Sequence, residues 1–496
     1  MITVNFDERG ERGLCEYLYF SIKNQILEGI LRADEKLPSK RSLASHLGIS
    51  VITVQNAYGQ LISEGYIYSI EKKGFFVTDI LLENADSGFN QSENENFEKT
   101  GLSGSSVFTT ASESHKIQDS GHSSPFTSLS ERDYFTDFRS NSTSYEKFPF
   151  SLWAHTMRKV LNSGDEKLLQ RVGVKGIYEL RRSIADYLRE FRNMNVKPEQ
   201  LVIGAGTESL YSMVVQLLGQ DKIYAVENPG YHKVEGVFRM NGAGTKPVMI
   251  DSQGINPAEL EKISADVVHV SPAHHFPTGI VMPVRRRQEL LAWAESAPNR
   301  FIIEDDYDSE FRFNGKPLPT LQSADKGGRV IYINSFSKTL APSFRMSYMV
   351  LPKKLLAEFD EKFGFYSCPV SAFEQYTLSE FIRDGFYGKH IIRMKNFYRN
   401  LRNELIRALE NSQISNKMII KEEEAGLHFL LSVKGTESSD ELQNKIQKKN
   451  INLPLLRDFY YGTPPDDIEN IFVINYSGIR KERIAETVKR LEDVLM

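Results

Sequence analysis

Residues 330–345 read VIYINSFSKTLAPSFR, an apolar run that gives way to a hydroxyl-rich loop carrying Lys338. The run at 330–333 has the length and β-branched content of a buried strand, so Lys338 follows the carboxyl end of that strand. Ligands of open α/β sheets bind at this edge. A lysine that is partly buried there beside an arginine loses its proton more easily, and its neutral amine can form a Schiff base with a carbonyl cofactor.

The same loop offers groups that suit a phosphate. Ser335 and Ser337 supply hydroxyls, and Arg345 supplies a guanidinium fork that matches two phosphate oxygens. A lysine near serines is, by itself, more often part of a solvated basic loop. The interpretation therefore depends on signals elsewhere in the chain.

Two further motifs follow predicted strands on the amino-terminal side. GAGTES at 204–209 comes after an apolar run and opens a helix, where the backbone N–H groups of Gly206, Thr207 and Glu208 can bind phosphate. ENPGY at 227–231 also follows an apolar run and places Tyr231 where it can stack on a cofactor ring. Alone, the first is a common glycine turn and the second is equally compatible with a core tyrosine.

A cluster of acids follows the strand predicted at 301–303. Pyridoxal 5'-phosphate (PLP) needs an acid against its pyridine nitrogen, and we expect Asp305 to supply it. Tyr307 can hydrogen-bond the 3-oxygen of the ring. The alternatives are acids that cap the next segment, or a magnesium site, which is disfavoured without a Walker-type phosphate loop.

The chain divides into three segments. Residues 1–80 form a small helical unit with a hairpin, residues 81–130 are rich in Ser, Asn, Glu and Gly, and residues 131–496 alternate apolar runs with helical stretches. The middle segment buries too little apolar surface to fold, so we expect a flexible linker, with a docked surface loop as the alternative. The third segment predicts a mostly parallel sheet with helices on both faces (about 166–350), followed by a smaller α+β subdomain (about 352–496).

The first segment has the pattern of a DNA-binding unit. Leu14, Leu18, Ile22 and Ile26 recur at helical spacing, and two short helices capped by Ser39 and Ser50 are separated by Gly48. The second of these helices enters the major groove in a helix-turn-helix protein, and a two-stranded wing follows it. We expect DNA contacts from the helix ends, the outward face and the wing tip: Lys40, Arg41, Ser50, Thr53, Gln55, Asn56, Lys72, Lys73 and Gly74. A helical unit used only for protein contacts is the alternative.

Bulk properties exclude several classes of protein. A chain of 496 residues is too long for a single hydrophobic core, so we expect at least two domains. Because the net charge of the chain is −4, evidence for DNA binding must come from a local motif and not from the overall charge. Cys15 and Cys368 are far apart, which argues against disulfides and a structural zinc site and fits a reducing compartment. No signal peptide or membrane span is evident, so we expect a cytoplasmic protein with no metal centre.

The ordered motifs GTES, ENPGY, SPAHHFPTG, EDDYDSEF and SFSKTLAPSFR closely resemble those of the fold-type I aminotransferases. With the N-terminal segment, the chain is similar to the MocR-type (GabR-like) branch of the GntR regulators. The resemblance implies a multidomain fold, with an N-terminal winged helix-turn-helix (α+β) joined to an α/β PLP-dependent aminotransferase fold type I domain that has a smaller C-terminal α+β subdomain. It also implies a head-to-tail homodimer with PLP held on Lys338 as an internal aldimine.

Carried over to matching positions, the resemblance supports the roles of Asp305, Tyr307 and Tyr231 at the ring and of Ser335 and Arg345 at the phosphate. Several positions depart from the pattern. Phe276 stands where many aminotransferases have Asn, and INYS at 474–477 lacks the usual carboxylate-binding Arg. We expect Arg457 and Lys233 as substitute carboxylate binders. Val51 and Gln55 stand where Arg is common, which weakens the salt-dependent part of DNA affinity.

Three functions are compatible with these residues. The first is a transcription regulator that senses an amine, an amino acid or PLP through exchange at Lys338 and responds at a double-stranded DNA operator. The second is a genuine aminotransferase with an appended DNA-binding domain, which the missing Asn and Arg disfavour. The third is a cofactor-free scaffold, which the visible absorbance of a lysine-bound PLP would exclude.

Overall fold

The structure is a computed structural model, and it describes residues 4, 6–9, 13–70, 73–78, 134–139, 147–313, 318–423, 425–435 and 437–496. The predicted linker at 81–130 and Lys72 lie outside the described residues. Within the described part, no helix combines the length and apolar character needed to cross a lipid bilayer.

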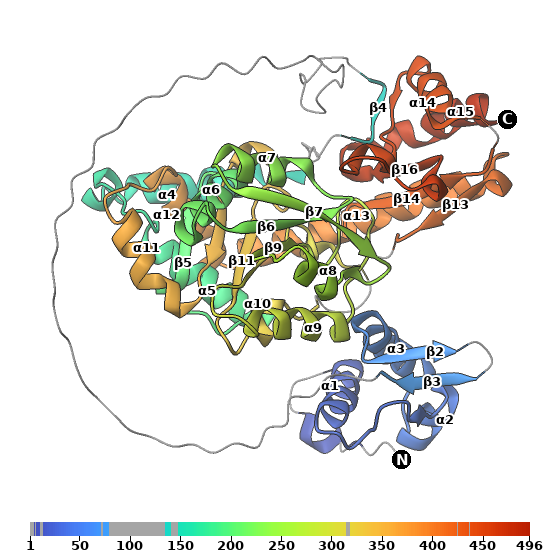
Figure 1. Ribbon diagram of the computed structural model, residues 1–496, viewed down its shortest axis with the longest axis horizontal. Helices are drawn as coiled ribbons and strands as arrows, with labels where there is room; N and C mark the ends of the chain where they lie inside the picture. Colours follow the sequence, from blue (N-terminus) through green and yellow to red (C-terminus); the bar gives the residue numbers. More distant parts are fainter. Residues whose placement is uncertain are drawn as a thin grey trace. The chain divides into compact units, whose positions relative to one another are not determined.

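The N-terminal domain is a three-helix unit with a small antiparallel sheet (Figure 1). Its elements are α1 (Leu14–Leu27), β1 (Lys36–Leu37), α2 (Lys40–Leu47), α3 (Val51–Glu64), β2 (Ile67–Ile70) and β3 (Gly74–Val77). The sheet has the order β1-β3-β2, so a short strand before α2 joins the predicted hairpin. Leu18, Ile22, Val54, Tyr58 and Leu61 are fully buried in its core, as their helical spacing predicts.

Capping residues mark the ends of α2 and the start of α3 where the sequence predicts them. The hydroxyl of Ser39 accepts a hydrogen bond from the N–H of Ser42 at the start of α2, and Ser50 does the same for Thr53 at the start of α3. Gly48 follows α2 in the left-handed conformation, with φ of 65°, which glycine adopts without steric cost. The turn between the two helices is thus encoded locally.

The large domain is built on an eight-stranded sheet of order β5-β12-β11-β10-β9-β6-β7-β8. Strands β11, β10, β9, β6 and β7 are parallel, while β12 and β8 run antiparallel to their neighbours. The bounds are β5 (Leu201–Gly204), β6 (Ile223–Asn228), β7 (Gly244–Asp251), β8 (Gly254–Ile255), β9 (Val267–Val270), β10 (Phe301–Asp305), β11 (Val330–Ser335) and β12 (Ser347–Val350). The apolar runs that precede GAGTES, ENPGY, EDDYDSEF and SFSKTLAPSFR form β5, β6, β10 and β11, as predicted.

Alternate residues of these strands supply cores on opposite faces of the sheet. Ile303 and Ile331 pack with α6 (Thr207–Leu218), α7 (His232–Met240) and α11 (Leu356–Phe363). Their neighbours Ile302 and Val330 pack on the other face, with α8 (Pro257–Lys262), α9 (Val284–Glu295) and α10 (Leu321–Ala324). Figure 1 shows α6 and α7 on one side of the sheet and α9 and α10 on the other. The apolar runs are therefore continuous because both faces are covered.

The C-terminal subdomain is a three-stranded antiparallel sheet of order β13-β14-β16, covered by helices. Its elements are α13 (Phe386–Glu410), β13 (Met418–Lys421), β14 (His428–Val433), α14 (Ser439–Lys448), β15 (Ile451–Asn452), β16 (Ile471–Asn475) and α15 (Ile484–Leu495), and β15 pairs with β4 (Thr136–Asp137). A 3₁₀ turn at Lys481–Arg483 leads directly into α15.

The second core starts later than the predicted boundary at 352. Helix α12 (Ala372–Arg383) packs against α4 (Phe150–Asn162) and α5 (Tyr178–Arg192), and its Leu378 and Phe381 belong to the core on the large sheet. Within α13, Tyr387 joins that core, whereas Met394 joins the core of the C-terminal subdomain. The long helix α13 therefore connects the two cores.

Candidate functional site

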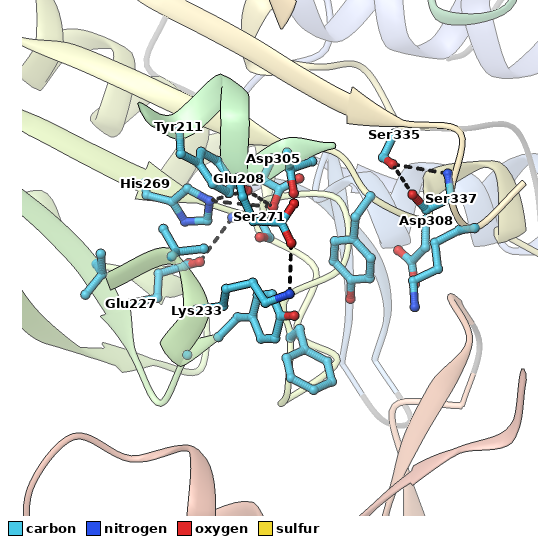
Figure 2. A pocket seen from close by; sticks show the side chains of 18 of the residues that line it. Glu208, Tyr211, Glu227, Lys233, His269, Ser271, Asp305, Asp308, Ser335 and Ser337 are labelled. Atoms are coloured by element: carbon cyan, nitrogen blue, oxygen red, sulfur yellow. Dashed lines mark hydrogen bonds and ion pairs between the residues drawn. The ribbon is translucent and has the colours of Figure 1, made fainter. Parts of the chain in front are cut away.

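A cavity of about 280 Å³ lies at the carboxyl ends of the parallel strands, the edge that the sequence predicts. It is bordered by residues of the large sheet and by residues 427, 428, 461 and 475 of the C-terminal subdomain. The structure brings ten of the predicted site residues to its wall: Thr207, Glu208, Tyr231, Lys233, Asp305, Tyr307, Ser335, Ser337, Lys338 and Arg345. Figure 2 shows part of this arrangement.

Lys338 follows β11 in the loop that borders the cavity. Burial lowers the pKa of its ammonium group to about 8, although the carboxylate of Asp308 opposes this shift. An amine with this pKa supplies much more of its neutral, nucleophilic form near pH 7 than an ordinary lysine. The position therefore suits covalent attachment of a carbonyl compound.

The carboxylate of Asp305, at the end of β10, has one oxygen engaged and one available. Its Oδ2 accepts a hydrogen bond of 2.6 Å from the hydroxyl of Tyr211, and His269 Nε2 lies 3.6 Å from the same oxygen. Its Oδ1 is buried and has no hydrogen-bond partner among the described residues. A buried carboxylate oxygen without a partner is costly, so this atom fits an N–H donor such as a protonated pyridine ring.

Tyr307 borders the cavity beside a buried histidine. Its hydroxyl lies 3.2 Å from His274 Nδ1, which is also 2.9 Å from Asp308 Oδ2. The closer carboxylate is the stronger acceptor, so we assign the Nδ1 proton to the bond with Asp308. The hydroxyl of Tyr307 then keeps its own proton for a partner in the cavity. Burial raises the pKa of Tyr307 well above its usual value, which also favours the protonated hydroxyl.

His274, Asp308 and His428 also form a cluster whose nitrogen and oxygen atoms lie within 4.8 Å of one another. From the sequence, no metal centre is expected. Within the cluster, His274 Nδ1 lies 2.9 Å from Asp308 Oδ2, and the ring centroids of His274 and His428 are 4.4 Å apart.

Two hydroxyls and a helix start border the cavity, and the helix start lies beside Arg345. Ser335 Oγ donates to Ser337 Oγ at 2.8 Å and accepts from the N–H of Ser337 at 3.1 Å. Gly206 precedes α6 with φ of 91°, and a Cβ on it would lie 2.5 Å from Nη2 of Arg345. Only glycine leaves this space open without backbone strain. Donors of this kind suit a phosphate, and their role in binding one stays a prediction.

The side chain of Glu208 also projects into this region. One carboxylate oxygen accepts from Lys233 Nζ at 2.9 Å, and the other accepts from Arg345 Nη2 at 2.9 Å (Figure 2 shows the contact with Lys233). Burial acts to raise the pKa of Glu208, but the hydrogen bonds from the two cations outweigh it and lower the pKa to about 2. The two predicted cations thus share one carboxylate, a contact that the motif GTES did not indicate.

The predicted ring-stacking residue lies at the cavity, but one of the two predicted carboxylate binders does not. Tyr231 borders the cavity, 43% exposed, with its ring edge-to-face against Phe276 at a centroid distance of 5.9 Å. Arg457 is not among the residues that border the cavity, and its guanidinium pairs with Asp440. The structure therefore brings Lys233, but not Arg457, to the site.

Sequence reasoning missed several residues of the cavity: Tyr211, His269, Asp308, His428 and Tyr461. Asp308 lies within the EDDYDSEF motif and could have been found there. Tyr211 is one turn into α6 and His269 is inside β9, so their apolar surroundings concealed them. His428 and Tyr461 come from the C-terminal subdomain, which only folding brings to this edge.

The second candidate site is the surface formed by α2, α3 and the wing. Arg41, Ser50, Gln55 and Asn56 are exposed, whereas Lys40 and Thr53 are half-buried. Lys73 is exposed in the wing turn, and Gly74 begins β3. Exposed polar residues on one helix face and cations nearby are typical of a DNA-binding surface.

The start of α3 also presents apolar groups that sequence reasoning did not select. Val51 is 42% exposed and Ile52 is 70% exposed. An aliphatic group at this end of a recognition helix can contact the methyl group of thymine. The signal was available, since Ile52 is apolar yet lies outside the helical spacing of the core residues.

Comparisons with known proteins agree with this architecture. The family model "Aminotransferase class I and II" matches residues 135–491, and "Bacterial regulatory proteins, gntR family" matches residues 14–77. The uncharacterized HTH-type transcriptional regulator YhdI of Bacillus subtilis is 33% identical over 492 residues, which cover 99% of this chain and 97% of YhdI. The probable rhizopine catabolism regulatory protein MocR of Rhizobium meliloti is 29% identical over 481 residues, covering 97% and 93%.

Among solved structures, kynurenine aminotransferase of Pyrococcus horikoshii has a TM-score of 0.64 at 23% identity, covering 74% of this chain and 91% of that enzyme. This likeness shows the fold, which is the PLP-dependent aminotransferase fold, and the gntR match identifies the N-terminal domain as DNA-binding. The predicted fold class is therefore confirmed. The chain belongs to the MocR-type branch of the GntR family of transcriptional regulators, which joins a winged helix-turn-helix domain to an aminotransferase-like domain.

Proposed function

We propose that this regulator holds PLP on Lys338 and changes its action on operator DNA when a primary amine or amino acid displaces that lysine. One observation carries the proposal: Lys338, with its lowered pKa, borders the same cavity as Asp305, whose Oδ1 is buried without a described partner. A nucleophilic amine and an unpaired acceptor in one cavity match the two ends of a pyridine aldehyde. PLP, when bound, supplies the aldehyde with which amines condense.

The remaining residues hold and orient the cofactor. Asp305, itself fixed by Tyr211, accepts from the ring nitrogen, and Tyr307 directs its proton towards the ring oxygen. Arg345, the Ser335 and Ser337 hydroxyls and the start of α6 bind the phosphate. Lys338 must be neutral to attack, and its released amine takes up a proton when an effector replaces it.

Sensing is better supported than turnover. Phe276 borders the cavity where many aminotransferases have an amide, and a phenyl ring offers no hydrogen bond to the ring oxygen. Asn475 stands near the position of the usual arginine, and its side-chain oxygen accepts from the backbone and the hydroxyl of Ser477. Both positions lack groups that transamination of amino acids uses.

A two-state arrangement would link the cavity to DNA. An effector that removes the bond to Lys338 changes the relative free energy of two conformations, and DNA binding changes only if it favours one of them. We propose a head-to-tail homodimer as the unit that binds the operator. Large exposed apolar side chains such as Leu169 (83%) and Phe365 (70%) on the aminotransferase-like domain support an association surface.

The test is a spectral titration of the PLP-loaded full chain, with and without operator DNA. We expect the visible band of the bound cofactor to be absent in Lys338→Ala and to change on addition of a primary amine in the natural protein. The amine affinity should change when operator is present, because coupling between two ligands is reciprocal. An unaltered band in Lys338→Ala would refute the site, and equal amine affinity with and without operator would refute the coupling. Steady production of 2-oxo acid at enzyme-like rates would favour the aminotransferase alternative.

A further inference from the structure

The cavity contains a carboxylate where an anionic effector would need a cation. Glu208 bridges Lys233 and Arg345 at 2.9 Å each, and its side chain is only 28% exposed. This geometry is separate from the contacts of Lys338 and Asp305, which carry the proposed function. It raises the question of which charge the cavity offers to an effector.

We propose that Glu208 makes the cavity select primary amines without an α-carboxylate over α-amino acids. The inference rests on the proposed function, because it concerns the amine that replaces Lys338. It narrows that function to one class of effector.

The cations that border the cavity are few. Among the described residues of its wall, the lysines and arginines are Lys233, Lys338 and Arg345. Lys338 is the attachment point, and the proposed function assigns Arg345 to the phosphate. Once the phosphate engages Arg345, Glu208 remains paired with Lys233, so this last cation is already neutralised.

A carboxylate on the effector would therefore approach Lys233 against the negative charge of Glu208. Hydrogen bonds from Lys233 and Arg345 lower the pKa of Glu208 to about 2, and the bond from Lys233 is the larger of the two, so it still favours the ionised carboxylate when Arg345 binds the phosphate. Like charges at close range in a partly buried site repel strongly. An amine that lacks the carboxylate avoids this repulsion.

The other walls also favour such an amine. Tyr231, Phe276, Tyr461 and Val234 present aromatic and aliphatic surface to the cavity. Arg457, the other predicted carboxylate binder, is paired with Asp440 away from this wall. An apolar carbon chain on the effector gains burial here. For a carboxylate, the wall cation left unpaired among the described residues is the Lys338 ammonium that the exchange itself releases.

The experiment compares matched ligands in the PLP-loaded full chain. The probes are 2-phenylethylamine against phenylalanine and 1,4-diaminobutane against ornithine, each pair differing by one carboxylate. Dissociation constants come from the change in the cofactor band, at PLP concentrations that saturate every variant. We expect each amine to bind at least about tenfold more tightly than its amino acid.

Glu208→Gln tests the cause, because it removes the charge and keeps the size. We expect the amine preference to fall by about tenfold, chiefly through tighter binding of the amino acids to the released Lys233. Glu235→Gln is the matched control: it removes the same charge from α7, where Glu235 accepts from Thr245, outside the cavity wall. In Glu235→Gln, the ratio of amine affinity to amino-acid affinity should equal that of the natural protein. Retention of the PLP band and the melting temperature checks that each variant is folded.

The possible outcomes distinguish a failure of the amine selectivity from a failure of the proposed exchange at Lys338. If the band responds but amino acids bind as well as amines, or if Glu208→Gln and Glu235→Gln give the same preference, the selectivity inference is wrong and the sensor remains. If no probe alters the band of PLP-loaded protein, the proposed exchange at Lys338 fails, and the inference fails with it.

Discussion

The pH dependence of PLP capture offers the most direct test of the environment of Lys338. Its pKa is about 8, against a usual value of 10.5, because burial disfavours the charged form. Only the neutral amine attacks an aldehyde. At pH 7 about one such lysine in ten is neutral, compared with about one in 3,000 for an ordinary lysine, so capture is faster by about 300-fold at equal nucleophilicity.

The assay mixes cofactor-free protein with PLP in a stopped-flow instrument and follows the visible band from about pH 6.5 to about pH 9.5. Nα-acetyl-lysine, measured in parallel, corrects for ionisation of PLP itself. We expect the corrected rate for the protein to rise about tenfold per unit below pH 8 and to level off above it. A rate that keeps rising tenfold per unit to the end of the range would refute the reasoning, since Lys338 would then behave as a solvated lysine.

The same pKa shift has a consequence for stability, with a definite sign. Between about pH 8 and pH 10.5 the unfolded chain binds more protons at Lys338 than the folded chain. The contribution of this group to the free energy of unfolding of cofactor-free protein therefore increases with pH across that window. Lys338→Met should remove this part of the dependence, which melting temperatures measured at several pH values would detect.

Three further predictions concern other parts of the chain. Arg41→Ala should weaken operator binding and reduce the salt slope by about one phosphate contact, and a filter-binding series with an unchanged slope would exclude the contact. Gly206→Ala should weaken PLP binding by about tenfold, because a φ of 91° strains a residue with a Cβ and that Cβ would lie 2.5 Å from Nη2 of Arg345. Unchanged affinity in a fluorescence titration would contradict this. Asp305→Asn should weaken PLP binding similarly, because a neutral amide stabilises a protonated ring nitrogen poorly, whereas Tyr211→Phe, which leaves the carboxylate in place, should have a smaller effect.

Much of this architecture could be predicted from local sequence. Caps at Ser39 and Ser50 and the turn at Gly48 fix α2 and α3 within a few residues, because a hydroxyl and a left-handed glycine satisfy helix ends locally. The apolar runs predict the parallel strands, because a strand that is covered on both faces is apolar throughout. Asp305 and Lys338 then follow from strand ends, which meet at one edge of the sheet.

Other features depend on contacts between distant segments. Asp305 Oδ1 has no hydrogen-bond partner in the described part of the chain, and this could be known only after folding had placed Tyr211 on the other oxygen. The lowered pKa of Lys338 likewise depends on the surroundings that bury it. The bridge from Glu208 to Lys233 and Arg345 joins three segments whose spacing carries no signal. The sequence by itself determined the two domains and the place of Lys338 after the end of a strand, because caps, periodicity and strand ends are local. Only the tertiary structure decided which charges remain unpaired in the cavity, because electrostatic pairing depends on distances that folding sets.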